Sequence, residues 1–202
     1  TQIVFTDSGS IADIKKAGLA KFSAKMLNEG TKKFGSNDFA LKLESQAINI
    51  SASTGTETFV FEVSSLKDKY ATSMKYLKML LSDPNYTDEA FQKVQTMSIG
   101  ALSQKEDDFD YIASINLRKL LFDKTVLAQP SNGTIDSVKS IALEDVKDFV
   151  KSHLVLSRAI IVVGGDLELK DVKKELKKTL NVLQKGKSSK VPYFQASSTS
   201  KE

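Results

Sequence analysis

The residues that bear most directly on chemistry lie in a predicted helix over residues 17–30. Lys21 and Lys25 stand one helical turn apart, so their side chains point the same way, and Ala24 directly precedes Lys25. Two histidines and a glutamate at this H-x-x-E-H spacing would hold a zinc ion and polarise its bound water. Ammonium groups do not bind zinc at neutral pH, and a methyl group accepts no proton. The three residues therefore predict a helix without metal chemistry.

The two lysines admit two interpretations. In the first, they contact a phosphate or a peptide carboxylate inside a cleft. In the second, they are helix-surface lysines whose aliphatic stems pack on the protein while the ammonium groups reach water. The second interpretation is the more common one for exposed lysines, and the sequence favours it.

No other set of residues forms a recognisable active site. His153 is the only histidine, so the chain has neither a histidine pair for a metal nor a second imidazole for catalysis. The acidic run at 106–110 lacks the D-x-D-G spacing of a calcium loop, and acidic residues are favoured before a helix start by the helix dipole. No serine has the G-x-S-x-G setting of a hydrolase nucleophile.

Composition narrows the class of protein. The chain has 202 residues, of which 41% are hydrophobic and 27% charged, enough for a substantial core. No apolar run is long enough to cross a membrane, and the absence of cysteine excludes disulfides. The net charge is +4, but only Arg118 and Arg158 are arginines, which argues against nucleic-acid binding. The compartment is not determined; for a bacterial protein it is the periplasm or the cytoplasm.

The elements that must position these residues follow from hydrophobic periodicity. Alternation predicts strands at 2–6, 48–53 and 58–63, the last two forming a hairpin. A continuous apolar run at 159–163 predicts a central strand covered on both faces. Three- and four-residue spacing predicts helices at residues 17–30, 36–44, 66–81, 87–102, 108–122, 146–154 and 169–183. The fold class is α+β, a mostly antiparallel sheet with helices packed on it.

Several short segments resemble a known family. The frame at 18–31 resembles G-x-A-H-x-x-E-H-x-x-F-x-G-T, the zinc-helix pattern of the pitrilysin, insulinase and mitochondrial processing peptidase family. Further matches in the family's order are Gly9-Ser10, Asp83-Pro84 with Phe91, Pro130 with Gly133-Thr134 and Ile141, and the strand end Val162–Leu167. The resemblance covers about residues 3–185. It implies the α+β fold of this family's metallohydrolase domain.

The resemblance also shows what has been lost. In active members a third zinc ligand, a glutamate, lies some 76 residues after the second histidine, which corresponds here to Ala101. The positions Lys21, Ala24, Lys25 and Ala101 all depart from the pattern together. We therefore expect no catalytic residue, no bound metal and no cofactor.

By analogy with the family, the chain is a non-catalytic domain of a zinc-metallopeptidase assembly. Its partner would be a homologous domain or subunit that carries zinc, and the two would enclose a peptide substrate. The alternative is a structural assembly subunit with no peptidase role. We expect no direct contact of this chain with nucleic acid or membrane, although the alternative predicts that the subunit belongs to a membrane complex.

The ends of the chain carry further expectations. Residues 1–185 would form the inert peptidase-like domain, and 186–202 a linker or tail rich in Lys, Ser and Thr. The family's domain begins with one more strand ahead of residues 2–6, so the chain is expected to be a fragment of a longer subunit. A sheet without that strand would present an unpaired edge, which favours pairing with a second copy of the chain.

Overall fold

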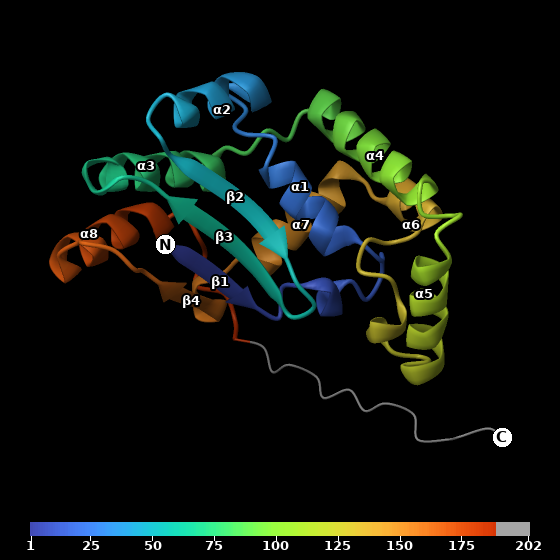
Figure 1. Cartoon of the computed structure of the whole chain (residues 1–202). Coiled ribbons are helices and arrows are strands. Elements are labelled where there is room, and N and C mark those ends of the chain that lie inside the picture. Colours follow the sequence, from blue (N-terminus) through green and yellow to red (C-terminus); the bar gives the residue numbers. More distant parts are fainter. Residues whose placement is uncertain (189–202) are drawn as a thin grey trace.

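The structure is a computed structural model that describes residues 1–188. Its centre is a four-stranded antiparallel sheet in the order β2-β3-β1-β4 (Figure 1). The strands are β1 (Gln2–Thr6), β2 (Asn49–Thr54), β3 (Thr58–Ser64) and β4 (Ala159–Val162). The predicted hairpin is β2–β3, in which Ala52 lies opposite Phe61. The predicted α+β class is confirmed.

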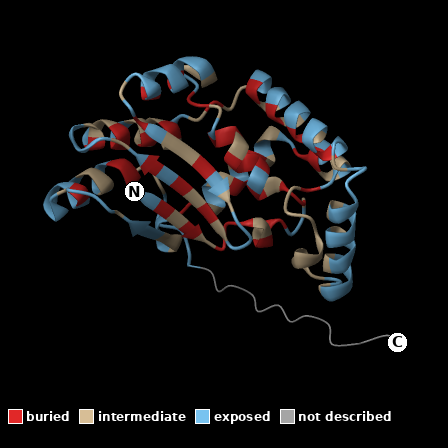
Figure 2. Ribbon diagram, viewed as in Figure 1, coloured by how far each residue is buried: buried red, intermediate tan, exposed pale blue. Residues whose placement is uncertain are grey.

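Helices cover one face of the sheet. The side chains of Ile3, Phe5, Phe59 and Phe61 have no exposed surface and point into the core, whereas the residues between them lie on the open face. This alternation gives the striped colouring of the central strands in Figure 2, where helices such as α1 and α7 lie behind the sheet. The pattern is the one expected of an antiparallel sheet with one solvated face.

Eight α-helices and four short 3-10 turns complete the described chain. The α-helices are α1 (Leu19–Leu27), α2 (Gly35–Glu44), α3 (Tyr70–Ser82), α4 (Asp88–Ser103), α5 (Phe109–Leu121), α6 (Ile135–Ser140), α7 (Leu143–His153) and α8 (Leu169–Leu180). The 3-10 turns are η1 (Ser10–Ala12), η2 (Lys67–Lys69), η3 (Val126–Ala128) and η4 (Leu156–Arg158). The helix α6 was not predicted, because six residues are too few to show a helical period. None of the described helices is both long and apolar enough to span a bilayer.

Helix α1 lies between two hydrophobic clusters. Ala20, Ala24 and Leu27 face the larger cluster, which joins the sheet to α2, α3, α7 and α8. Phe22 and Met26 face a smaller cluster built with α4, α6 and the start of α7. Helix α1, which carries the altered zinc pattern, therefore packs against both hydrophobic clusters.

The strand predicted at residues 159–163 is confirmed as β4, but its predicted position at the centre of the sheet was wrong. Within the described part of the chain, β4 pairs only with β1 and forms an edge of the sheet. Ile160, Ile161 and Val162 are 55%, 37% and 56% exposed. A run of apolar residues indicates a strand but does not show whether another strand lies beside it, and here the apolar surface remains uncovered.

Helix α5 also departs from expectation. It begins and ends close to the predicted bounds, and its start is capped by Asp108, whose side chain accepts from the Tyr111 N–H. None of its residues is buried, and Leu120 is 75% exposed. In Figure 1 it stands at the side of the molecule away from the sheet. The apolar side predicted for it is only partly covered, since Tyr111 and Ile115 are half-buried whereas Ile112 and Leu120 are exposed.

After α8 the chain runs alongside the 3-10 turn η4, which directly precedes β4. The backbone N–H groups of Leu156 and Ser157 donate to the carbonyls of Gln184 and Lys185, each at 2.9 Å. The predicted tail at 186–202 lies outside the described residues from 189 onward.

Candidate functional site

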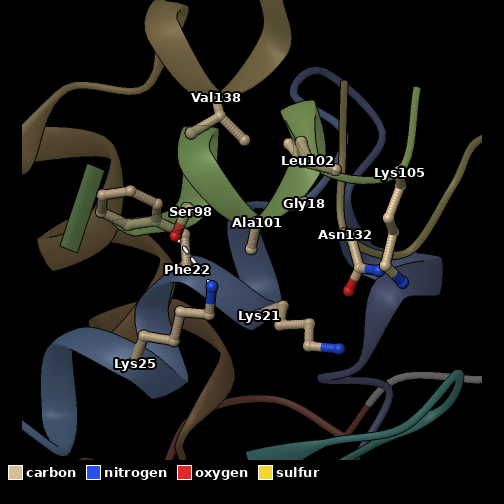
Figure 3. A pocket seen from close by; sticks show the side chains of 10 residues that line it. All are labelled: Gly18, Lys21, Phe22, Lys25, Ser98, Ala101, Leu102, Lys105, Asn132 and Val138. Atoms are coloured by element: carbon tan, nitrogen blue, oxygen red, sulfur yellow. Dashed lines mark hydrogen bonds between the residues drawn. The ribbon is translucent and has the colours of Figure 1, made fainter. Parts of the chain in front are cut away.

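A pocket of about 210 Å³ lies where α1 faces α4. Figure 3 shows the side chains that line it, which come from four segments of the chain. Gly18 lies at the start of α1, and the helix itself contributes Lys21, Phe22 and Lys25. Helix α4 contributes Ser98, Ala101 and Leu102, and the lining is completed by Lys105 just beyond the end of α4, by Asn132 and by Val138. The pocket is thus basic on one side and apolar on the other.

The start of α1 is held by Asp13, which is 2% exposed. Its two carboxylate oxygens accept from the backbone N–H groups of Gly18 at 2.9 Å and Ala20 at 2.8 Å. These donors are among the N–H groups that a helix start leaves without partners. Burial raises the pKa of Asp13 to about 7, and the two N–H donors limit that rise.

Two glycines allow the loop before α6 to approach the start of α1. Gly18 has a φ of 88°, and a Cβ at this position would lie 2.7 Å from the backbone oxygen of Asn132. Gly133 has a φ of 75°, and its Cβ would lie 2.5 Å from the oxygen of Ala17. The Ser137 hydroxyl also donates to that oxygen, at 2.9 Å. This close contact is the physical reason for glycines at 18 and 133, and it brings Asn132 to the pocket.

Lys25 is the most constrained of the basic residues. It is partly buried, and its Nζ donates to the Oγ of Ser98 at 2.8 Å. Burial lowers the pKa of the Lys25 ammonium group, and the positive charge of Lys21 lowers it further. Lys25 is therefore more than a surface lysine, whereas Lys21 is exposed as the sequence interpretation expected.

The positions that correspond to the zinc pattern are only partly brought together. Lys21, Lys25 and Ala101 line the pocket, although Ala101 lies on a different helix. Ala24 points elsewhere: it is 3% exposed and packs in the cluster against the sheet. Residues 1–188 contain no group of three His, Cys, Asp or Glu side chains placed to hold a metal ion.

The edge of the sheet beside α1 is covered by a side chain. The Asn28 amide donates to the Ala52 carbonyl at 2.9 Å, and its oxygen accepts from the Ala52 N–H at 2.8 Å. The phenylalanine of the zinc-helix pattern would stand at this position. Asn28 therefore satisfies, on β2, the backbone groups that an added strand would use.

Sequence reasoning missed several residues of the site. Asp13, Ser98, Lys105 and Asn132 come from separate elements, and no local spacing relates them to the lysines of α1. The resemblance at Pro130 and Gly133-Thr134 was the one available signal, since Asn132 lies inside that segment.

Comparison with known proteins adds to this geometry. The family described as "Insulinase (Peptidase family M16)" matches residues 1–134, and that described as "Peptidase M16 inactive domain" matches residues 140–202. A curated relative, "Non-peptidase homolog YmxG" of Helicobacter pylori, is 40% identical over 200 residues, covering 99% of this chain and 46% of the relative.

More distant similarities agree in fold. "Probable mitochondrial-processing peptidase subunit beta" of Arabidopsis thaliana is 22% identical over 89% of this chain and 34% of its own length. The crystal structure of a peptidase M16 inactive domain from Pseudomonas fluorescens superposes with a TM-score of 0.87 at 21% identity, covering 94% of this chain and 46% of that one. The chain thus spans half or less of the length of these proteins.

Proposed function

Because the chain belongs to the insulinase family, peptidase family M16, we propose that it is a non-catalytic domain of a zinc-metallopeptidase assembly. In this role it would form part of the wall around an enclosed peptide and support the half that carries zinc. An inert wall affects which substrates are cut, because the closed volume excludes water and larger chains.

One observation carries this proposal: the supports of the zinc helix are present without the ligands. Asp13 holds the start of α1, and Gly18 and Gly133 permit the contact with the loop before α6. The pocket beside that helix is nevertheless lined by Lys21, Lys25 and Ala101. The similarity to a protein named as a non-peptidase homolog supports the same function.

The test is reconstitution with the zinc-bearing homologue of the same organism. Alone, this chain is expected to hydrolyse no peptide and to retain no zinc after dialysis. Added to the zinc-bearing homologue, it should raise peptide hydrolysis at least about tenfold, which corresponds to roughly 1.4 kcal/mol in the barrier. A stable complex with unchanged activity would refute the proposal, as would zinc that stays bound in a one-to-one ratio.

The alternative function, a structural assembly subunit without a peptidase role, is favoured by a different observation. Helix α5 carries exposed apolar side chains, with Phe109 84% and Leu120 75% exposed. Under this alternative, α5 would contact another protein of a larger complex. Reconstitution distinguishes the two, since an assembly subunit would form a complex without increasing hydrolysis.

The edge strand β4 suggests how further chain would attach. Its apolar residues are exposed, and no described strand pairs with its outer edge. We propose that this edge accepts a strand, either from a preceding segment of a longer subunit or from a second copy of the chain. If residues 1–202 self-associate in light scattering, Ile160→Lys should shift them toward the monomer. An association that the charged variant leaves unchanged would contradict edge pairing between copies.

A further inference from the structure

We propose that the pocket between α1 and α4 binds a carboxylate, supplied by an acidic side chain of the enclosed peptide. The inference rests on the proposed function in one respect, namely that a peptide lies beside this domain. Under this proposal, the pocket at the altered zinc site prefers peptides that carry an acidic side chain.

Three ammonium groups border the pocket. Lys21 and Lys25 project from α1, and Lys105, two residues beyond the end of α4, lies beside Asn132 (Figure 3). None of the three forms an ion pair with any residue from 1 to 188. The Lys105 ammonium group forms a cation–π contact with the Tyr111 ring, whose centroid lies 4.7 Å from Nζ. The pocket lining contains no acidic residue.

The acidic groups near α1 are already engaged elsewhere. Asp13 accepts from two backbone N–H groups behind the pocket. Glu29, beyond the end of α1, pairs with Lys93 at 2.8 Å, and Asp145 pairs with Lys16. The neighbouring lysines Lys16 and Lys93 thus have partners within the domain. The basic side of the pocket is left for an anion from outside.

The electrostatics of Lys25 agree with this assignment. Burial and the charge of Lys21 both lower its pKa, which means that the protonated form is destabilised in the unliganded pocket. A carboxylate placed between the two ammonium groups would offset their repulsion and strengthen the charged form. Binding of the anion would therefore be accompanied by a rise in the pKa of Lys25.

The rest of the lining fits an acidic side chain better than a small inorganic anion. Phe22, Leu102 and Val138 form an apolar wall on which the methylene groups of a glutamate can pack. The Ser98 hydroxyl, which accepts from Lys25, keeps its own hydrogen for a second acceptor. No arginine lines the pocket, although arginine is the residue best suited to bidentate contacts with phosphate.

The experiment uses the full chain and three capped pentapeptides. The peptides are acetylated and amidated, so that no terminal charge remains, and differ only in a central glutamate, aspartate or glutamine. Amide chemical shifts of Ser98 and Asn132 report binding at the pocket. The glutamate peptide is expected to shift both resonances. The aspartate peptide should bind with lower affinity, and the affinity of the glutamine peptide should be lower by at least about tenfold. Raising the salt concentration should weaken the binding of the glutamate peptide, because salt screens the attraction between the charges.

The matched variants remove the charge and keep a polar side chain that is one atom shorter. The triple variant carries Lys21→Gln, Lys25→Gln and Lys105→Gln. It should bind the glutamate peptide at least about tenfold more weakly and the glutamine peptide with unchanged affinity. Lys173→Gln, an exposed lysine of α8 outside the pocket, is the control and should change neither. Equal binding of glutamate and glutamine peptides, or full binding by the triple variant, would overturn the proposal.

Two further arms separate the sources of failure. Inorganic phosphate that shifts Ser98 and Asn132 when no peptide does would show an anion site for free phosphate, and would also overturn the peptide assignment. In the reconstituted peptidase, activation by this chain without any preference for acidic peptides would leave the proposed function standing and refute the pocket assignment. A lack of activation would refute the proposed function, while the binding experiment would still decide the pocket.

Discussion

Helices α1 and α5 both carry apolar side chains, yet their surroundings are opposite. Six of the nine residues of α1 are buried, because the helix packs on a hydrophobic cluster at each side. No residue of α5 is buried, and most of its apolar side chains are exposed to solvent. The difference shows that the frame of the zinc helix is maintained by packing that is independent of any metal. Its pocket-facing positions could therefore change without loss of the fold.

The two helices also begin differently. The start of α1 is held by the buried Asp13, which lies outside the helix and within a preceding turn. The start of α5 is held by its own capping residue, the exposed Asp108. The first turn of α1 is thus held by a buried carboxyl group five to seven residues upstream, whereas that of α5 is held by an exposed residue directly before the helix.

The largest effect is expected from restoring the zinc pattern on α1 with Lys21→His, Ala24→Glu and Lys25→His. Ala24 lies in an apolar cluster at 3% exposure, so a glutamate there is buried without a partner. An uncompensated buried charge costs roughly 3–5 kcal/mol. Denaturant unfolding should show a loss of this size.

The triple variant should also hydrolyse no peptide when zinc is supplied, because Ala101 provides no third ligand and no second residue orients the imidazoles. The double variant Lys21→His with Lys25→His is the control: it should unfold close to the original protein and be equally inactive. Zinc-dependent hydrolysis by the triple variant without a partner would contradict this explanation of why the domain is inert.

A direct comparison of the two helices uses Leu27→Ala and Leu120→Ala. Leu27 on α1 has no exposed surface, and truncating a buried leucine costs roughly 2–5 kcal/mol. Leu120 on α5 is 75% exposed, and its truncation should stay within about 0.5 kcal/mol. Guanidinium midpoints of the two variants measure the difference. Equal midpoints would mean that α5 is held as firmly as α1.

The contact at the start of α1 is tested by Gly18→Ala. The φ of 88° is disfavoured for any residue with a Cβ by roughly 1–2 kcal/mol, and the added carbon would meet the Asn132 oxygen at 2.7 Å. We expect a loss of at least this size. Gly100→Ala on α4 is the matched control, since nothing lies within 4 Å of its Cβ, and it should stabilise by up to about 1 kcal/mol. Similar thermal midpoints for both variants would argue against a tight contact.

A separate expected effect is a pH dependence of stability that comes from Asp13. Its folded-state pKa of about 7 lies above the ordinary value of 3.8, so the folded protein keeps a proton that the unfolded chain releases. The free energy of unfolding should therefore fall as pH rises from about 4 to about 7, by at most roughly 1.4 kcal/mol per pH unit.

The variant Asp13→Asn should remove this slope, as measured by denaturant midpoints between pH 4.5 and 7.5. Asp108→Asn, at the start of α5, should keep it. The pKa of His153 is lowered by burial, so this residue destabilises the fold as pH falls, but it does so in all three proteins and cancels from the comparison. A slope that survives in Asp13→Asn would exclude Asp13 as its source.

The sequence by itself determined the class of fold and predicted that α1 carries no zinc chemistry. Alternation located β1 and the β2–β3 hairpin, and helical spacing located most helices, because each pattern is local and repeats within one element. The residue types at 21, 24 and 25 exclude a zinc triad in any fold, since neither lysine nor alanine can replace its groups.

Only the tertiary structure decided what surrounds these elements. The apolar run at 159–163 is compatible with a central or an edge strand, and its place was set by pairing with β1 alone among the described strands. The pocket depends on contacts between residues far apart in sequence, such as Lys25 with Ser98 and Gly18 with Asn132. Such contacts leave no periodic signal, because they arise only when separate elements pack against one another.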